Sequence, residues 1–353
     1  MKVLYIGESW LGSCARSIKE ALARQPGIVL DEVNEDLFFP IAHREKWLRG
    51  IHQVLRPSYR REFYRETLKK IRIINPDCII AYKGWHLGAD FLRAIKALAI
   101  PTINIYPDYS PHAYGRAHKE AVGVYDMIIS SKPFHPRLWQ STYGYSNTCL
   151  YVPQGYEPAL HLVDSPESNQ PFDITMVATW RPEYGELMKR LGKLLDKKNI
   201  KVGIGGNGWS EHRSDYPDNW VFAGALHGRA YIDWLRSGKI CLAPVTRDVR
   251  IGDAQQPGDE DTTRTYELAA AHCFFIHRRT DLVQTLYDET TEVPMYDSAD
   301  ELAEKILHYL PRSKERLRLA RNAHQRAVPA YSLDARAADI CQIISELKPD
   351  NIH

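Results

Sequence analysis

The sequence predicts an α/β protein with a parallel sheet in each half of the chain. Short apolar runs alternate with longer amphipathic segments over residues 2–155, and the same alternation starts again at residue 173. Such strand–helix–strand repetition favours parallel sheets covered by helices on both faces. Between the two series, residues 157–173 are rich in proline, serine and acidic residues, a composition typical of a linker.

The first half contains a series of apolar runs of strand length. The first run, "KVLYIG", is followed by an amphipathic segment, "GSCARSIKEALARQ", which predicts a helix capped by Ser9 or Ser13. Another predicted helix, "GADFLRAIKALAI", separates two later runs. The predicted strands of this half are 2–7, 28–33, 77–83, 102–108, 126–132 and 148–155.

The second half repeats the pattern and then ends in helices. Helices are predicted over 183–195 and 228–238, and consecutive helices without an intervening strand fill 299–348. The predicted strands of this half are 173–180, 201–206, 219–224, 239–245 and 273–277. Two similar α/β halves joined by one linker are therefore the expected architecture.

The composition excludes several classes of protein. The chain has 353 residues, of which 44% are hydrophobic and 25% charged, an ordinary soluble globular mix that is long enough for two domains. A net charge of +2 does not indicate a nucleic-acid-binding protein. The scattered cysteines include no CxxC pair, so neither a zinc site nor a disulfide framework is indicated. The sequence shows neither the apolar run of a signal peptide nor a segment of membrane-span length, so we expect a cytoplasmic protein.

The stretch "GDEDTTRTYELAAAHCFFIH", residues 258–277, crowds polar groups where a loop enters a helix. Ligands of open α/β sheets bind beyond the carboxyl ends of strands, where a helix N-terminus presents free N–H groups to an anion. Thr262 and Thr263 are expected to cap this helix, and the guanidinium of Arg264 can donate two parallel hydrogen bonds to a diphosphate. Glu267 is a candidate acceptor for the hydroxyls of a ribose. The alternative is a capped surface helix with solvated charges.

Several segments of the second half carry a more specific pattern: "FAGALHGRAYIDWLRSGKICLAPV", "TTRTYELAAAHCFFI", "MYDSADELAEKILHYL" and "RLRLARNAHQRAV". With the two-domain plan, they resemble the GT-B glycosyltransferases, and more narrowly the spore maturation protein CgeB-like (glycosyl transferases group 1) family. The resemblance implies Rossmann-like domains over 1–160 and 171–330 whose sheets face a central cleft. It also implies a C-terminal helix over 331–353 that crosses back to the first domain.

The resemblance places a nucleotide-diphosphate sugar, the donor, in the second domain without an obligatory metal ion or other cofactor. Arg181 is a candidate diphosphate contact, and the loop of Gly205, Gly206 and Asn207 would lie near the base and phosphates. A surface arginine and an ordinary glycine-rich turn are the alternatives.

Retaining relatives carry two acids eight positions apart, a spacing kept here by Asp259 and Glu267. Glu260 is an alternative for the first acid. The family usually has glycine where this chain has His272, so we expect the turn after the helix to be rebuilt.

In GT-B relatives the loop after the first strand faces the cleft, which makes a set of its residues candidates for acceptor contacts: Gly7, Ser9, Trp10 and Gly12. A tight strand-to-helix turn is the alternative. This loop lacks the GxGxxG spacing, so dinucleotide binding is rejected.

Two other strand ends of the first half carry polar and aromatic groups. Lys83 and Trp85 are candidates for holding an acceptor. Asp108 and His112, with His118 further on, suit general-base work on an acceptor hydroxyl if the reaction inverts. A packed tryptophan and solvated loop histidines are the alternatives.

Residues 43–72 carry ten Lys and Arg against three Glu, with aromatic residues between them. We expect either contact with an anionic membrane surface or a polyphosphate-bearing acceptor, or else a solvated helix face.

The function expected from these features is transfer of a sugar, such as a hexosyl group, from a nucleotide-diphosphate sugar to an acceptor hydroxyl in glycan biosynthesis. The acceptor is a glycan, a lipid-linked molecule or a protein, and nucleic acid is not a partner. A sugar-nucleotide epimerase and a non-catalytic nucleotide-sugar-binding or scaffold protein are the alternatives.

Overall fold

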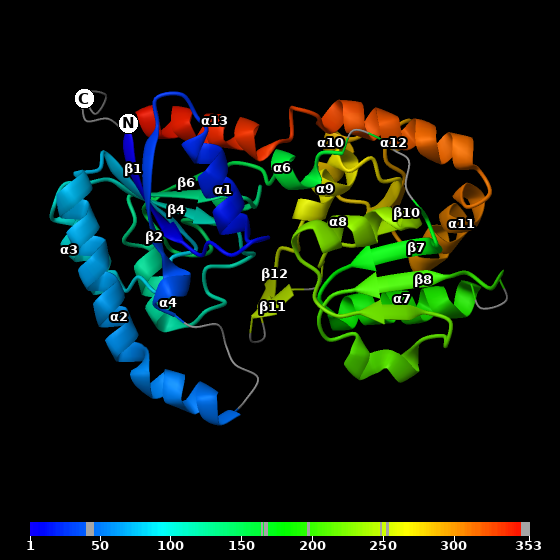
Figure 1. The fold of residues 1–353 in the computed structure, drawn as a ribbon, viewed down its shortest axis with the longest axis horizontal. Coiled ribbons are helices and arrows are strands. Elements are labelled where there is room, and N and C mark those ends of the chain that lie inside the picture. The colour runs from blue at the N-terminus through cyan, green and yellow to red at the C-terminus, as the bar shows by residue number, and fades with distance from the viewer. Residues whose placement is uncertain are drawn as a thin grey trace. The chain divides into compact units, whose positions relative to one another are not determined.

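A computed structural model describes residues 1–39, 46–163, 165, 169–195, 198–247, 249–251 and 254–346. The chain divides into two compact units, the first made of Met1–Pro153 and Arg336–His353 and the second of Gln154–Ala335. Each unit is built on a six-stranded sheet whose described strand pairs are all parallel (Figure 1). The predicted fold class, α/β with two parallel sheets, is confirmed.

The sheet of the first unit has the strand order β2-β1-β3-β4-β5-β6. Its strands are β1 (Lys2–Gly7), β2 (Val29–Asn34), β3 (Cys78–Tyr82), β4 (Thr102–Tyr106), β5 (Met127–Ser130) and β6 (Thr148–Tyr151). Every residue of β3 and β4 is buried, as expected for central strands covered on both faces. The helices of this unit are α1 (Cys14–Ala23), α2 (Lys46–Ile74), α3 (Ala89–Lys96), α4 (Arg116–Val122), α5 (His135–Leu138) and most of α13 (Leu333–Glu346).

The sheet of the second unit has the order β14-β13-β10-β7-β8-β9. Its strands are β7 (Phe172–Val177), β8 (Val202–Gly205), β9 (Val221–Ala223), β10 (Gly238–Ala243), β13 (Phe275–Arg278) and β14 (Met295–Tyr296). An antiparallel pair, β11 (Val249–Ile251) and β12 (Ala254–Gln256), was not predicted. The helices are α6 (Pro158–His161), α7 (Pro182–Leu195), α8 (Gly228–Arg236), α9 (Thr263–Ala270), α10 (Asp281–Leu286), α11 (Ala299–Tyr309) and α12 (Ser313–Ala327).

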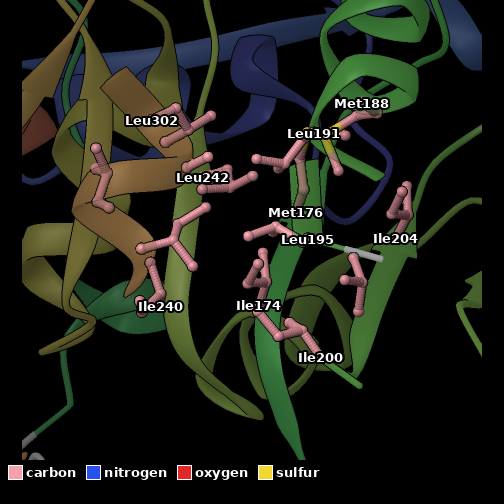
Figure 2. Close-up of a cluster of buried hydrophobic side chains, with 14 of the residues drawn as sticks. Ile174, Met176, Met188, Leu191, Leu195, Ile200, Ile204, Ile240, Leu242 and Leu302 are labelled. Atoms are coloured by element: carbon pink, nitrogen blue, oxygen red, sulfur yellow. The ribbon is translucent and has the colours of Figure 1, made fainter. Parts of the chain in front are cut away.

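Apolar side chains of the central strands pack against α7 and α11 to form one core of the second unit. Figure 2 shows Ile174 and Met176 along β7, with Met176 the nearer of the two to Met188 of α7, and Leu242 of β10 near Leu302 of α11. All five side chains are fully buried. Because this core fixes β7 and β10, it also fixes the loops that leave their carboxyl ends.

Helix α6 forms within the predicted linker, and its His161 is buried. One local expectation is corrected. The turn after α9 is not rebuilt: His272 adopts φ +54°, the left-handed backbone that glycine would favour. The ring of His272 stacks on His324 of α12 at 3.5 Å between centroids. Nδ1 of His324 lies 3.1 Å from the carbonyl oxygen of Ala270, so α12 provides a partner for the last turn of α9.

Within the described residues, no helix is long and apolar enough to cross a membrane. Part of the basic stretch and of the C-terminal tail, residues 43–45 and 347–353, lies outside the described residues.

Candidate functional site

The carboxyl ends of the parallel strands define one edge of each sheet. In the second unit, strand order changes direction between β7 and β10, because β8 and β9 lie on one side and β13 and β14 on the other. Such a switch point is where open α/β sheets bind ligands. Most donor-site candidates lie in three segments near this edge. Arg181 lies in the loop after β7, Gly205 ends β8 and is followed by Gly206 and Asn207, and residues 259–262 precede α9, whose first turn holds Thr263 and Arg264.

The loops after β7 and β8 are tightly joined. Gly206 has φ +122°, and a Cβ at this position would lie 2.0 Å from the carbonyl oxygen of Ala178. The backbone N–H of Trp180 donates to the carbonyl oxygen of Asn207 at 2.8 Å. Glycine is therefore required here by close approach of two backbones. The side chains of Arg181 and Asn207 are exposed.

Helix α9 starts in a network that fixes its N-cap residue, Thr262. The hydroxyl of Thr265 accepts from the N–H of Thr262 at 3.1 Å and contacts Nε2 of His277 at 2.8 Å. Nδ1 of His277 lies 2.7 Å from the carbonyl oxygen of Arg278, so Nδ1 carries the proton and Nε2 accepts from Thr265. Burial, with the nearby Arg264 charge, lowers the pKa of His277 to about 4, which keeps this imidazole neutral.

Arg264 and Thr263 lie in the first turn of α9, and both are half-buried. Nη2 of Arg264 donates to the carbonyl oxygen of Pro244 at 3.0 Å, which ties the side chain to the loop after β10. Its buried Nε has no hydrogen-bond partner among the described residues. The guanidinium is thus held in place by one hydrogen bond, while its Nε–H can still donate to a ligand. It lies beside the first N–H groups of α9.

Glu267 lies one turn further along α9 and is only 8% exposed. Its Oε2 accepts from the hydroxyl of Tyr231 at 2.5 Å, and its Oε1 lies 3.5 Å from Nε2 of His161. Nδ1 of His161 accepts from the N–H of Glu157 at 3.0 Å, so Nε2 carries the proton that faces Glu267. Burial first and the Glu267 charge second raise the pKa of Tyr231 well above its usual value.

Tyr231 and His161 were not predicted as neighbours of Glu267. They come from α8 and α6, so no local sequence pattern links them to α9. A carboxylate has room for about four hydrogen bonds, and these two partners leave part of that capacity to a ligand.

The acidic loop before α9 is hydrogen-bonded and ion-paired to the loop after β10. Glu260 forms an ion pair with Arg247 at 2.9 Å, and its backbone oxygen accepts from the hydroxyl of Thr280 at 2.7 Å. The N–H of Asp259 donates to the carbonyl oxygen of Thr246 at 2.7 Å. Glu260 therefore has a structural partner, and Asp259 keeps the eight-position spacing to Glu267.

At the carboxyl edge of the first unit, the structure brings together three predicted residues. Nζ of Lys83 lies 3.6 Å from Oδ2 of Asp108 and 5.2 Å from the ring centroid of Trp85. Trp85 is 46% exposed, and its ring lies 4.8 Å from that of Tyr114, which is 38% exposed. Two accessible aromatic rings beside an ion pair can stack on a sugar while the charged groups bind its hydroxyls.

The two histidines near Asp108 differ. His112 points toward other aromatic rings, at 5.3 Å from Tyr143, so the structure does not join it to Asp108. His118 is 8% exposed, and neither of its ring nitrogens has a hydrogen-bond partner among the described residues. Burial lowers the pKa of His118, and the charge of Asp108 opposes this shift. Oδ2 of Asp108 also lacks a hydrogen-bond partner.

The loop after β1 resembles a strand-to-helix turn that is tied to acidic neighbours. The N–H of Ser9 donates to Oδ2 of Asp36 at 2.7 Å, and Nζ of Lys19 donates to the Ser9 hydroxyl at 2.7 Å. Gly12 has φ +96°, and a Cβ on Gly7 would lie 3.1 Å from the ring of Tyr5. Trp10 is 37% exposed. Within the described residues, no group of three or more His, Cys, Asp and Glu side chains is arranged to hold a metal ion.

A family comparison covers a part of the chain that includes α9. Residues 185–342 match a family model described as glycosyl transferase-like. No curated protein matches the chain.

Solved structures share the fold at low sequence identity. Sucrose-phosphate synthase from Thermosynechococcus elongatus is 14% identical, with 98% of this chain and 99% of that chain covered and a TM-score of 0.65. The Anabaena HepE protein in complex with UDP-glucose is 13% identical, with 98% and 100% covered and a TM-score of 0.66. The UDP-GlcNAc 2-epimerase from Neisseria meningitidis, bound to UDP-GlcNAc, is 11% identical, with 98% and 100% covered and a TM-score of 0.54. The chain thus has the GT-B fold, and residues 185–342 match a family model described as glycosyl transferase-like.

Proposed function

We propose that this protein is a glycosyltransferase of the CgeB-like group, which transfers a sugar from a nucleotide-diphosphate sugar to an acceptor hydroxyl. The observation that carries this proposal is the start of α9, where an anchored Arg264 with an uncommitted Nε lies beside the helix N–H groups. The family match over residues 185–342 and the HepE complex with UDP-glucose support the same assignment.

In this proposal the donor binds along the carboxyl edge of the second unit. Arg264, Thr262 and Thr263 at the start of α9 hold the diphosphate, with Arg181 and Asn207 on the neighbouring loops. The bond between the sugar's anomeric carbon and the diphosphate oxygen breaks, and a bond to the acceptor oxygen forms as its proton leaves. The developing charge on the diphosphate is stabilised by fixed N–H donors and a guanidinium, without a metal ion.

Glu267 is proposed to bind the ribose diol of the nucleotide. Tyr231 and His161 hold its carboxylate in place, so the ligand meets an oriented acceptor rather than a mobile one. Asp259, or Glu260 beside it, is proposed to face the sugar.

The first unit is proposed to bind the acceptor, with Trp85 as a stacking surface. Asp108 is the proposed base if the reaction inverts. His118 is proposed to act beside Asp108 in place of His112. The charge of Asp108 affects the pKa of His118, whereas His112 packs against the ring of Tyr143. The same proposal assigns residues 1–160 to binding of the acceptor and residues 171–330 to binding of the donor. It also places the protein in the cytoplasm.

Epimerisation of a nucleotide sugar is a second candidate, supported by the fold shared with UDP-GlcNAc 2-epimerase. Incubation with a nucleotide sugar and no acceptor separates the two functions, because only an epimerase then produces a second nucleotide sugar. A scaffold protein would bind the nucleotide and turn over nothing.

Calorimetry with UDP, GDP, ADP and dTDP in the presence of EDTA tests the donor site. We expect at least one nucleoside diphosphate to bind without added metal. Absence of binding to all of them would remove the donor site from the proposal.

A further inference from the structure

Three arginines of α2 line a hollow that is separate from the proposed donor site and from the exposed rings of Trp85 and Tyr114. Among the described residues, the hollow is lined by Arg56, Pro57, Arg60, Arg61 and Tyr64, and its volume is about 590 Å³. None of these described lining residues is acidic. The buried Nε of Arg60 has no hydrogen-bond partner among the described residues.

The positive charge of this hollow is not neutralised by neighbouring acids. In the described part of the chain, no ion pair involves Arg56, Arg60 or Arg61, whereas Arg65 on the same helix pairs with Glu62. Burial lowers the pKa of His86 to about 4, and the charges of Arg56 and Arg60 add to this shift. Several guanidinium groups without a counter-charge among the described residues are suited to bind a polyanion, because a guanidinium can donate two parallel hydrogen bonds to phosphate oxygens.

Tyr64 connects the hollow to the loop that carries the proposed acceptor residues. Its hydroxyl donates to the carbonyl oxygen of His86 at 3.0 Å and accepts from the N–H of Gly88 at 2.8 Å. The same loop, after β3, holds Lys83 and Trp85. A ligand whose sugar stacks on Trp85 therefore lies on the loop that borders the arginine hollow.

We propose that the hollow at Arg56, Arg60 and Arg61 is a phosphate site, and that the acceptor is a phosphate-bearing molecule whose phosphoryl group binds there. Naming the ligand as the acceptor rests on the proposed function, whereas the phosphate site itself stands on the hollow alone. The phosphoryl group belongs either to a lipid headgroup or to a water-soluble phosphate ester.

An exposed apolar face precedes the hollow on α2, which gives the lipid source a structural test. Ile51, Val54 and Leu55 are 46%, 79% and 41% exposed, and their i, i+3, i+4 spacing places them on one face of the helix. Residues 46–61 contain five Lys and Arg and no Asp or Glu. Figure 1 shows the first half of α2 extending beyond the sheet of its own unit.

Binding of inorganic pyrophosphate to the full chain, measured by calorimetry, tests the site. We expect the R56Q/R60Q/R61Q variant to lose at least about tenfold in affinity. The control R65Q/K69Q/R72Q removes the same charge from exposed positions of the same helix and should change affinity less than about twofold. Excess UDP in all titrations fills the proposed donor site, and circular dichroism melts confirm that each variant is folded. Equal pyrophosphate affinity in the two triple variants would overturn the proposal.

Sedimentation with phosphatidylcholine vesicles, with and without phosphatidic acid, identifies the source of the phosphate. For a lipid acceptor, the protein binds only the phosphatidic acid vesicles, and both R56Q/R60Q/R61Q and V54Q/L55Q abolish that binding. For a water-soluble acceptor, pyrophosphate binds and neither vesicle does. Either result supports the phosphate site. Failure of UDP to bind would contradict the donor proposal while leaving the pyrophosphate comparison intact.

Discussion

The carboxyl edges of the two sheets differ in how their polar groups are paired. In the second unit, Glu260 is paired with Arg247, and Glu267 is held by Tyr231. In the first unit, among the described residues, both ring nitrogens of His118 lack hydrogen-bond partners, and Oδ2 of Asp108 lies 3.6 Å from Nζ of Lys83. An unsatisfied buried polar group costs about 1–3 kcal/mol, which a bound ligand can recover. The difference lies in how the side chains are held: the acids of the second unit have close protein partners, whereas the buried ring of His118 does not. A donor without a partner remains in the second unit too, at Nε of Arg264.

The largest expected effect tests how rigid the donor edge is. Gly206→Val should destabilise the protein by more than about 3 kcal/mol, because the position combines a strained φ with a Cβ clash against backbone. Chemical denaturation measures the change. The matched control, Gly115→Ala in the first unit, has φ +83° with open space around the Cβ and should cost only about 1 kcal/mol. Similar losses for both would show that the joined loops are not a rigid element.

Acid titration tests the neutral His277 under α9. Its pKa of about 4 in the folded chain lies below the roughly 6.5 of an unfolded histidine, so the unfolded state binds the proton first. The stability that this group contributes is complete above pH ~6.5 and is lost as pH falls toward 4, up to about 3 kcal/mol. His277→Gln should flatten this slope, whereas His308→Gln on α11 should not. An unchanged slope in His277→Gln would contradict the proposed support of the N-cap.

Glu267→Gln tests the ribose contact. We expect UDP affinity to fall at least about tenfold, because a charge-assisted acceptor becomes an amide. Tyr231→Phe should lower the melting temperature and keep UDP affinity within about threefold, since it removes a support and not the acceptor. Glu304→Gln, an exposed acid of α11, is the neutral control. A folded Glu267→Gln protein with wild-type UDP affinity would contradict the ribose contact and leave Glu267 with a structural role alone.

Asp108→Asn should give the smallest effect on binding and a selective effect on turnover. We expect UDP affinity to stay the same while the transfer rate falls about tenfold. Asp90→Asn, a fully exposed acid of α3, controls for the loss of charge. A drop in UDP affinity without a drop in rate would place Asp108 outside the acceptor site.

Most strands and the loop that enters α9 could be predicted from sequence, because both depend on local patterns, whereas β11, β12 and β14 were not predicted. Apolar runs marked β3, β4, β7 and β10, and the cluster at 258–267 marked the loop that enters α9. Side-chain partners could not be predicted in this way. Tyr231 and Glu267 are 36 residues apart, and their contact exists only after α8 and α9 pack.

One local expectation was wrong. The glycine usual in the family suggested that His272 would disturb the turn after α9, but His272 adopts the left-handed backbone and stacks on His324. Here a tertiary contact accompanies a backbone conformation that the local preference disfavours.

Helix α13 makes the first unit discontinuous along the chain. Its residues from Arg336 onward group with Met1–Pro153, whereas everything between belongs to the second unit. On a ribosome, the second unit can therefore finish folding while the first still lacks its final helix. The first unit therefore completes its fold only after the ribosome has released residues that lie more than 180 positions beyond Pro153 in the chain.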